Sequence, residues 1–345
     1  MRKDQPILTI AIPTWNRSSY LRQNLEQLRS ELDVVGHNYV EVIVSDNCST
    51  DGTEGVVNES ILEGFKITYI RNETNLGWAR NFLQCIEISS GKYILLLGDD
   101  DVICDGLLSS LMPLLIRNNY GVICMRPFGY DSDFLKEKPG GDAKIRVYKD
   151  SKEFLIAISQ FFTLTSALII NREYLNNKVD IRQFIHTNLV TFHLVLRASL
   201  AAEENVFLDQ FVIASKRQNS FSYEYYKVFV DEFWEIIDAH KIYGLSFECA
   251  KKLETRHLFS YYPFYMFDLR ASARGDIDRT FKALKRRFKH RPMFWLWIAP
   301  TLKLPKPFAL TWGAVTTFIG RIYAGDFRRG LKFFRDRLSR VNFIL

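Results

Sequence analysis

The sequence predicts an α/β fold in which helices cover a mostly parallel sheet. Short apolar runs alternate with segments of helical periodicity through the first hundred residues, as in successive strand–helix units. The run at 93–97 is apolar throughout and bounded by glycines, which is typical of a strand buried on both faces. Polar residues follow most of these runs, at the edge where open parallel sheets bind ligands. We therefore expect them to meet at one site.

Local signals place the elements in order. The first strand is expected at 7–12, where Pro13 stops it, and leucines at helical spacing predict a helix at 18–32. Capping chemistry at Ser49-Thr50-Asp51 predicts a helix that ends near residue 63. The other expected elements are strands at 40–44, 65–70, 93–97 and 121–126, helices at 78–89 and 105–116, a mobile loop at 129–143, mixed structure at 151–215 and aromatic-rich helices at 225–273.

Length and composition exclude several classes of protein. A chain of 345 residues with 47% hydrophobic residues can bury one large core or two smaller ones. Its five cysteines include no Cys-x-x-Cys pair, which argues against a disulfide framework or a zinc site. No run of 18 apolar residues occurs, and the first residues lack the apolar core of a signal peptide. We expect a cytoplasmic protein.

The basic character of the chain is concentrated at its end. Residues 279–345 contain 16 Lys and Arg against two Asp, whereas residues 1–278 carry a net negative charge. Between 279 and 291, Phe281, Leu284 and Phe288 lie at helical spacing among basic residues, a pattern that suits an interface with anionic lipid. A second such pattern lies at 327–338. The alternative is a helical cap whose aromatics pack inward; nucleic acid fits less well, because the aromatics form apolar blocks.

Three consecutive carboxylates, Asp99 to Asp101, follow the apolar run at 93–97. They repel one another, so a cation that neutralises them is expected, and a divalent metal with a phosphate ligand is the leading interpretation. The alternative is a turn whose acidic side chains are simply solvated. The sequence contains neither a Gly-x-x-x-x-Gly-Lys-Ser/Thr loop for ATP nor a Gly-x-Gly-x-x-Gly loop for a dinucleotide.

Four polar segments stand in order along the first hundred residues. They are Pro13-Thr14-Trp15-Asn16-Arg17, Val44-Ser45-Asp46-Asn47-Cys48-Ser49-Thr50-Asp51-Gly52-Thr53, Asn75-Leu76-Gly77-Trp78-Ala79-Arg80-Asn81, and Gly91-Lys92-Tyr93 leading to Gly98-Asp99-Asp100-Asp101. In this order and spacing they resemble the family 2 glycosyltransferases of the GT-A fold, and the Asp-Asn and Gly-Asp-Asp-Asp variants resemble the abequosyltransferase-like branch of bacterial O-antigen assembly. The resemblance is strongest over about 95 residues and continues more loosely to about residue 222.

The resemblance implies an enzyme that transfers a sugar, with inversion, from a nucleoside diphosphate donor. By position in the family motif, Asp100 matches the metal-binding aspartate and Asp99 lies beside ribose and diphosphate. Asp101 orients the site and, with Asp100, is an expected ligand of the ion, Mg²⁺ or Mn²⁺. Asp46 and Asn47 match the pair that meets the base. Because an amide can donate as well as accept, Asn47 leaves a CDP-sugar open beside UDP- and dTDP-sugars.

Other donor contacts are implied by the same motifs. Thr14, Asn16 and Arg17 lie where the family's first loop touches the nucleotide, and Arg17 is expected to pair with diphosphate or with a surface acid. Arg80 and Asn81 are expected nucleotide contacts, with helix capping as the alternative. Arg217 lies where the family has a basic residue that closes on diphosphate, the alternative being a surface arginine in a turn.

The general base is where the sequence departs from the family. An inverting transfer needs a group that takes the acceptor proton, and the usual acid pair before the Leu-x-x-Arg helix is missing from 188–197. His193 is the nearest titratable residue and His186 the next; a packed core histidine is the alternative for His193. Asp180 and Asp131 are weaker candidates.

We expect a GT-A domain at 1–222, with a nucleotide-binding half at 1–105 and an acceptor half at 106–222. A helical region at 223–345 follows, of which 279–345 is expected to associate with the inner face of the cytoplasmic membrane. The predicted function is transfer to a lipid-linked saccharide in surface polysaccharide synthesis. The alternatives are a nucleotidyltransferase or sugar-nucleotide hydrolase with the same metal, and a non-catalytic sugar- or lipid-binding module.

Overall fold

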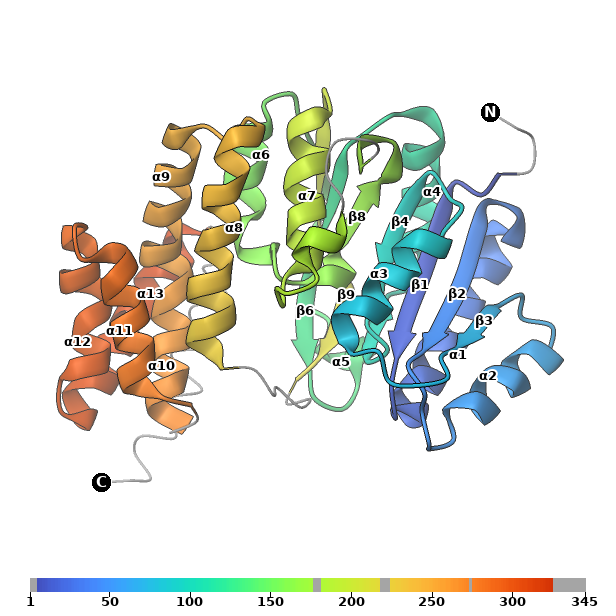
Figure 1. Cartoon of the computed structure of the whole chain (residues 1–345), viewed down its shortest axis with the longest axis horizontal. Helices are drawn as coiled ribbons and strands as arrows, with labels where there is room; N and C mark the ends of the chain where they lie inside the picture. Colours follow the sequence, from blue (N-terminus) through green and yellow to red (C-terminus); the bar gives the residue numbers. More distant parts are fainter. Residues whose placement is uncertain (1–4, 176–180, 218–223, 273–274, 325–345) are drawn as a thin grey trace. The chain divides into compact units, whose positions relative to one another are not determined.

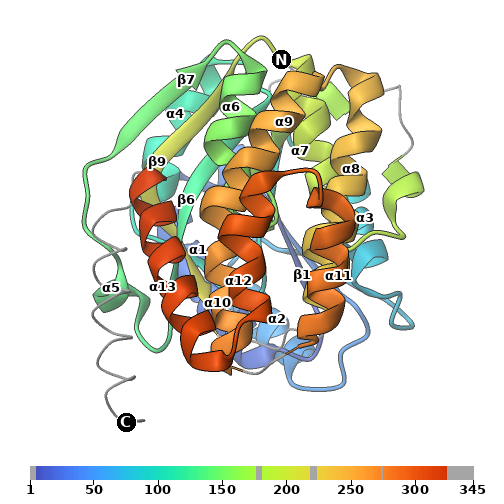
Figure 2. The ribbon, with the colours of Figure 1, turned by 90° about the vertical axis from the view of Figure 1, so that its left-hand side faces the viewer.

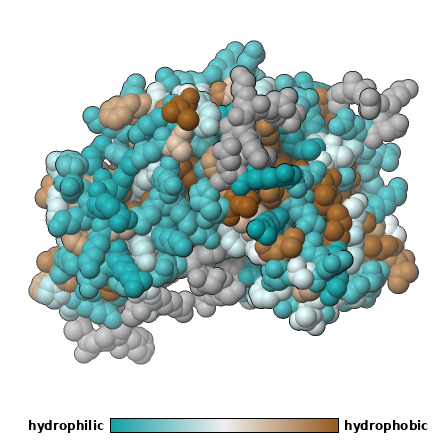
Figure 3. Space-filling view, in the orientation of Figure 1, coloured by the Kyte–Doolittle hydropathy of each residue, from teal (hydrophilic) through white to brown (hydrophobic). Residues whose placement is uncertain are grey.

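The structure is a computed structural model that describes residues 5–175, 181–217, 224–272 and 275–324. The chain divides into two compact units, residues 1–221 and 222–345. The first unit contains a sheet with helices on its faces, and the described part of the second is helical (Figure 1). The face drawn in Figure 3 is largely hydrophilic, with hydrophobic side chains interspersed.

The first unit is built on one mixed sheet. Its strands are β1 Leu8–Thr14, β2 Val40–Asp46, β3 Thr68–Arg71, β4 Tyr93–Leu96, β5 Asp101–Ile103, β6 Val122–Tyr130, β7 Lys144–Tyr148, β8 Leu168–Asn171 and β9 Asn205–Lys216. In the part of the chain that the structure describes, their order is β3-β2-β1-β4-β8-β6-β9-β5, with β7 paired to β9. The β3-β2-β1-β4 half is parallel, as is β6 on β9; the other pairs are antiparallel. The α/β prediction is confirmed, and the parallel ladder carries the candidate site at its carboxyl ends.

Helices cover both faces of this sheet. They are α1 Ser18–Val35, α2 Thr53–Leu62, α3 Trp78–Ile88, α4 Leu107–Arg117, α5 Phe134–Glu137, α6 Ser151–Ile158 and α7 Val190–Ala201. Leucines of α1 and α4 share one buried apolar cluster with alternate residues of β1, β2 and β4, whereas α3 and α7 lie in front of the strands in Figure 1. Strands β1, β2 and β4 are buried on both sides, which explains their largely apolar sequences.

Two sequence-based boundaries are wrong for identifiable reasons. Pro13 does not end β1, because β4 pairs with β1 only as far as Ala11; the missing N–H of Pro13 therefore breaks no ladder bond. The expected loop at 129–143 contains the end of β6 and helix α5. Asp133 caps α5 by accepting from the backbone of Leu135 and Lys136. Local capping thus replaces much of the expected irregular loop.

Helix α4 begins with help from a distant residue. Glu31 of α1 is buried, and its two carboxylate oxygens accept from the backbone N–H groups of Gly106 (2.7 Å) and Leu108 (2.9 Å). A carboxylate at a helix N-terminus satisfies donors that have no partner within the helix and complements its positive end. Helix α1 therefore fixes where α4 starts.

The second unit confirms the helical expectation for residues after 225. Its helices are Lys227–Glu232, α8 Phe233–Ala239, His240–Tyr243, α9 Phe247–Arg256, His257–Tyr261, α10 Tyr262–Ser272, α11 Ile277–Phe288, Phe294–Ile298, α12 Ala299–Lys303 and α13 Lys306–Tyr323. Helix α13 lies alongside α10 and α12, as Figure 2 shows. Among the described helices, none has the length and apolarity needed to cross a membrane.

The apolar face expected to contact lipid at 279–291 has another role. Leu284 and Phe288 of α11 are fully buried inside the second unit. Arg286 and Arg287 form ion pairs with acids of the same unit, at 2.6 Å for Arg286 with Asp231. This interpretation of α11 is therefore wrong, because the unit uses that face for its own core. The second basic pattern, at 327–338, lies outside the described residues.

Candidate functional site

The aspartate turn after β4 meets residues from the end of β1 and the loop that follows it. Asp99 and Asp100 follow β4, and both are buried. Thr14, the last residue of β1, donates its hydroxyl to Asp99 Oδ2 at 2.9 Å. Arg17, which precedes α1, places Nη1 3.1 Å from Asp99 Oδ1 and 2.7 Å from Asp100 Oδ2. The partners of Arg17 are thus the two motif aspartates rather than a surface acid.

The three aspartates hold their protons more tightly than ordinary carboxyl groups. Burial raises the pKa of Asp99 to about 6 although Arg17 opposes it, and burial also raises the pKa of Asp100. Asp101 begins β5; burial, reinforced by the neighbouring Asp100 charge, raises its pKa to about 7. One guanidinium does not offset three carboxylates at this spacing. Added positive charge would therefore favour their ionised forms.

Two residues that the sequence analysis did not single out hold the turn in place. Asn24 of α1 donates its amide to the carbonyls of Gly98 (3.0 Å) and Asp101 (2.7 Å), and Ser166 accepts from the backbone of Gly98 at 2.9 Å. Asn24 is buried, so these bonds are shielded from water. The signal for Asn24 was in the sequence: it is a polar residue inside the leucine stripe of α1.

Replacing Asn24 by Ala is expected to weaken donor binding at least tenfold. The turn would lose both side-chain bonds, and the partly buried carbonyls of Gly98 and Asp101 would lose a donor, which also costs about 2 kcal/mol of unfolding free energy. Titration calorimetry with the nucleotide sugar that the wild type binds best, and urea unfolding, measure the two effects. Gln27→Ala on the same helix is the control, because Gln27 bonds only Asp105 at an exposed position. Equal donor affinity in Asn24→Ala and wild type would contradict the assigned role.

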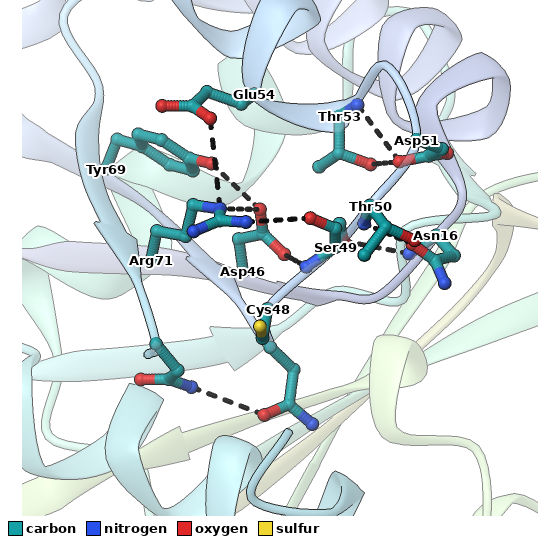
Figure 4. Close-up of polar contacts among 12 residues, drawn as sticks. Asn16, Asp46, Cys48, Ser49, Thr50, Asp51, Thr53, Glu54, Tyr69 and Arg71 are labelled. Carbon is teal, nitrogen blue, oxygen red and sulfur yellow. Dashed lines mark hydrogen bonds and ion pairs between the residues drawn. The ribbon is translucent and has the colours of Figure 1, made fainter. Parts of the chain in front are cut away.

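Asp46, at the end of β2, shapes the next loop. It is fully buried, and its two oxygens accept from the backbone of Ser49 and from the hydroxyl of Tyr69, each at 2.8 Å. Figure 4 shows Asp46 between Ser49 on one side and Tyr69 and Arg71 on the other, with Arg71 Nε at 3.8 Å. The expected base contact of Asp46 stays a prediction. In this structure its carboxylate supports the loop that would meet the base.

The side chain of Asn47 is hydrogen-bonded to the turn at Asn75 and Leu76. Its Nδ2 donates to Asn75 Oδ1 at 2.9 Å, and its Oδ1 accepts from the backbone of Leu76 at 2.8 Å. Both polar atoms of the amide therefore already have protein partners. The CDP-sugar hypothesis requires this side chain to exchange a partner for the base, so it stays a prediction.

Asn81 and Arg80, one residue apart on α3, lie in different surroundings. Asn81 is buried, accepts from the Ser45 hydroxyl at 2.7 Å and donates to the Ser45 carbonyl at 2.9 Å, so it ties α3 to β2. Arg80 is exposed. Of the two predicted nucleotide contacts, Arg80 is accessible to solvent, whereas Asn81 is buried and holds Ser45 of β2, just before the loop that follows this strand.

The loops after β1 and β2 are joined by hydrogen bonds. The backbone of Asn16 donates to Ser49 Oγ at 2.8 Å, and Asn16 Oδ1 accepts from the backbone of Thr50 at 2.7 Å, as drawn in Figure 4. Asn16 and Cys48 have φ angles of 53° and 64°, a region that costs residues other than glycine roughly 1–3 kcal/mol. Such strain persists where the surrounding contacts fix the backbone, as they do here.

The candidate bases differ in accessibility. His193 lies on α7, is only 2% exposed and stacks on Phe184 with ring centroids 3.5 Å apart. His186, just before α7, is exposed. Asp131 is also exposed but is paired with Arg217, and Asp180 lies outside the described residues. The structure thus presents His186 to solvent and keeps His193 in the core, and neither role is tested by it.

Arg217 follows β9 and faces the end of β6. Its Nη1 lies 2.7 Å from Asp131 Oδ2 and 3.4 Å from Glu137 Oε2. A Cβ on Gly129 would come within 2.7 Å of Arg217 Nε, so the glycine makes room for this side chain. The backbone N–H groups of Ser132, Asp133 and Asp131 lower the pKa of Glu137 to about 2, so it stays ionised beside Arg217.

The donor set of the aspartate turn suits a hard cation. Asp99 and Asp100 already converge on one cationic nitrogen of Arg17, and a Cβ on Gly98 would lie 3.1 and 3.2 Å from oxygens of Asp100 and Asp101. Among the described residues, no group of three or more His, Cys, Asp and Glu could hold a metal by itself. Mg²⁺ and Mn²⁺ fit this arrangement, because Mg²⁺ is commonly bound by one or two carboxylates together with substrate phosphates.

Comparison with protein families matches residues 9–177 to "Glycosyl transferase family 2". Abequosyltransferase RfbV of Salmonella typhimurium is 35% identical over 114 residues, 32% of each chain. The GalNAc(5)-diNAcBac-PP-undecaprenol beta-1,3-glucosyltransferase of Campylobacter jejuni is 25% identical over 176 residues, 50% of this chain and 56% of the relative. The aligned part thus spans about a third to a half of the length of these relatives.

Solved structures resemble the chain over most of its length. S. aureus TarS 1–349, determined in complex with UDP-GlcNAc, aligns with a TM-score of 0.56 at 16% identity, covering 96% of this chain and 92% of TarS. A mannosyltransferase from Pyrobaculum calidifontis, in complex with GDP-Man and Mn²⁺, aligns with a TM-score of 0.52 at 12% identity, covering 93% and 87%. At these identities the likeness shows the fold alone.

Proposed function

Because residues 9–177 form a domain of glycosyl transferase family 2, we propose that this chain transfers a sugar from a nucleoside diphosphate donor to a saccharide acceptor in bacterial glycan synthesis. The observation that carries the proposal is the cluster of Thr14, Arg17, Asp99 and Asp100, assembled from the loops after β1 and β4. Such a cluster provides both acidic and basic groups where a diphosphate would leave.

In this proposal Asp100 holds Mg²⁺ or Mn²⁺, as expected from the sequence. Asp99 takes the place of Asp101 as the second carboxylate, because Asp99 and Asp100 converge on the same cationic nitrogen of Arg17. When bound, the ion would stabilise the negative charge of the leaving diphosphate. Arg17 is within reach of the same position and pairs with phosphate once it is released from a carboxylate. Asn24 keeps the turn rigid while these partners change.

The acceptor side of the reaction is supported less directly. We propose inversion at the anomeric carbon, with an acceptor proton taken by His186 or His193, and a lipid-linked acceptor by analogy with the undecaprenol-linked substrate in the name of the Campylobacter relative. His186 is the first to test, because it is accessible and His193 is buried. We further propose that the protein acts at the inner face of the cytoplasmic membrane, attached through its basic, aromatic end.

A panel of UDP-, dTDP- and CDP-sugars tests the proposed donor class. We expect binding of one class to require Mg²⁺ or Mn²⁺ and to be lost with EDTA, measured by titration calorimetry on the full chain. Slow release of free sugar without acceptor would indicate a hydrolase instead. Binding of no nucleotide sugar with either metal would contradict the proposal, and equal binding of all three classes, or none of CDP-sugars, would remove the assignment of base choice to Asn47.

A further inference from the structure

Helix α13 has an apolar side that is partly exposed in the described structure. Phe308, Trp312, Val315, Ile319 and Ile322 are 37–68% exposed. Their spacing of four and three residues puts all of them on one side of the helix, over about 21 Å of its length. Scattered exposed apolar residues are ordinary, whereas a continuous stripe of this length marks a surface that meets another apolar phase. We call these five residues the α13 stripe.

The side of α13 that packs on the protein is made of small residues. Ala309, Gly313, Thr316, Thr317 and Gly320 are buried. A Cβ on Gly320 would lie 2.6 Å from the carbonyl oxygen of Phe259, and one on Gly313 would lie 2.9 Å from Thr301. Small residues toward the neighbouring helices and large apolar ones outward are the arrangement of helices that contact lipid. An ordinary surface helix has the opposite distribution.

Charge indicates which apolar phase the stripe meets. Residues 222–345 contain 23 Lys and Arg against 12 Asp and Glu, so the second unit is basic as a whole. Five of the ten basic residues in 279–324 form ion pairs with acids of this unit: Arg279, Arg286, Arg287, Arg291 and Lys303. Lys306 begins α13 and is exposed. Exposed Lys285 and Trp295 lie near each other, with Lys285 Nζ 5.8 Å from the ring centroid. Two copies of so basic a surface would repel each other, whereas anionic headgroups would attract it. A tryptophan on the stripe suits the boundary between headgroups and acyl chains.

We propose that the α13 stripe inserts into the surface of an anionic bilayer, with α13 lying in the plane of the interface. Helix α13 lies within residues 279–345, the region that the sequence predicts to associate with a membrane, and its stripe takes the place of the apolar face of α11, which is buried. The purpose of this insertion rests on the proposed function, because the bilayer would hold the enzyme beside a lipid-linked acceptor. Its test measures lipid binding alone and needs no sugar donor, so the two proposals can fail separately.

Sedimentation of the full chain with vesicles tests the proposal. We expect binding to vesicles of phosphatidylcholine with 30% phosphatidylglycerol, at least tenfold weaker binding to phosphatidylcholine alone, and a loss with added salt. Val315→Glu with Ile319→Glu should reduce binding at least tenfold. Ile242→Glu is the matched control, since Ile242 is 81% exposed in the same unit but outside the stripe, and it should bind as the wild type does. Circular dichroism checks that each variant is folded.

Quenching by brominated lipids gives a second readout. Trp312 should account for much of the quenching on vesicle binding, so Trp312→Phe should bind nearly as well but be quenched less. No binding of the wild type to anionic vesicles would overturn the proposal, as would an equal loss in Ile242→Glu. Sedimentation velocity tests whether a second copy of the chain covers the stripe instead of lipid. If Val315→Glu with Ile319→Glu converts a dimer to a monomer and leaves vesicle binding intact, the stripe is a subunit interface and the proposal is wrong.

Discussion

Replacing Asp100 by Asn is expected to lower the rate of sugar transfer on the order of a thousandfold. The metal ion that would stabilise the leaving diphosphate in the transition state would lose a carboxylate ligand. Asn keeps the size of the side chain and an oxygen for Arg17 Nη1, which now lies 2.7 Å from Asp100 Oδ2. The change therefore removes charge with little disturbance of packing. Turnover of the best donor in the wild type and the variant, at saturating metal, measures the effect.

Asp105→Asn is the control for this experiment. Asp105 lies five residues further along the chain, is exposed, and accepts only from Gln27 among its hydrogen bonds in this structure. It should retain wild-type turnover. Thermal unfolding should show that both variants are folded. If Asp100→Asn retained more than a tenth of the activity, Asp100 would not be the metal ligand, and Asp99 would be the next to change.

Acidification is expected to destabilise the second unit, with His257 as the cause. Its ring is 1% exposed and packs among Phe233, Trp234 and Tyr262, with Nδ1 2.9 Å from the Leu253 carbonyl. Burial lowers the pKa of His257 to about 4, against an ordinary value of 6.5. Between these values the unfolded chain binds a proton that the folded chain does not. The contribution of His257 to the free energy of unfolding is therefore fully present above pH 6.5 and is lost as the pH drops toward 4.

From pH 7.5 to pH 5 this one group should cost about 2 kcal/mol of unfolding free energy. Urea unfolding followed by tryptophan fluorescence measures it, since Trp234, Trp295, Trp297 and Trp312 are all in the second unit. His257→Phe should flatten the dependence on pH, whereas the exposed His290→Phe should leave it unchanged. An unaltered slope in His257→Phe would assign the acid sensitivity to another group.

The parallel half of the sheet and the donor loops were predictable, because buried strands and motif aspartates leave local signals. The aspartate turn came out where the apolar run at 93–97 placed it, and Thr14 and Arg17 do meet it. The roles of Asp46 and Asn47 were not predictable, because both depend on loops brought together only by the fold. Whether a residue contacts a ligand or supports one that does cannot be read from its spacing.

The C-terminal region shows the same limit in another form. Periodicity correctly indicated that 279–291 is an amphipathic helix, but a hydrophobic face looks alike whether it meets lipid or protein. The small residues of α13 were a better signal, since Gly313 and Gly320 allow close helix packing. The antiparallel direction of β8 and the existence of β5 were not predicted, because strands of four and three residues are too short to show a periodic pattern.

Helix α1 sets the spacing of three residues that support the candidate site. Arg17 at its N-terminal end, Asn24 and Glu31 are seven residues apart, so they lie along one side at intervals of about 10 Å. They contact, in order, the aspartates, the carbonyls of their turn, and the first N–H groups of α4. Inserting a single residue in α1 between Asn24 and Glu31 would rotate one contact away from the others by about 100°. The spacing of these three residues along α1 therefore matters to the candidate site as much as the carboxylates do.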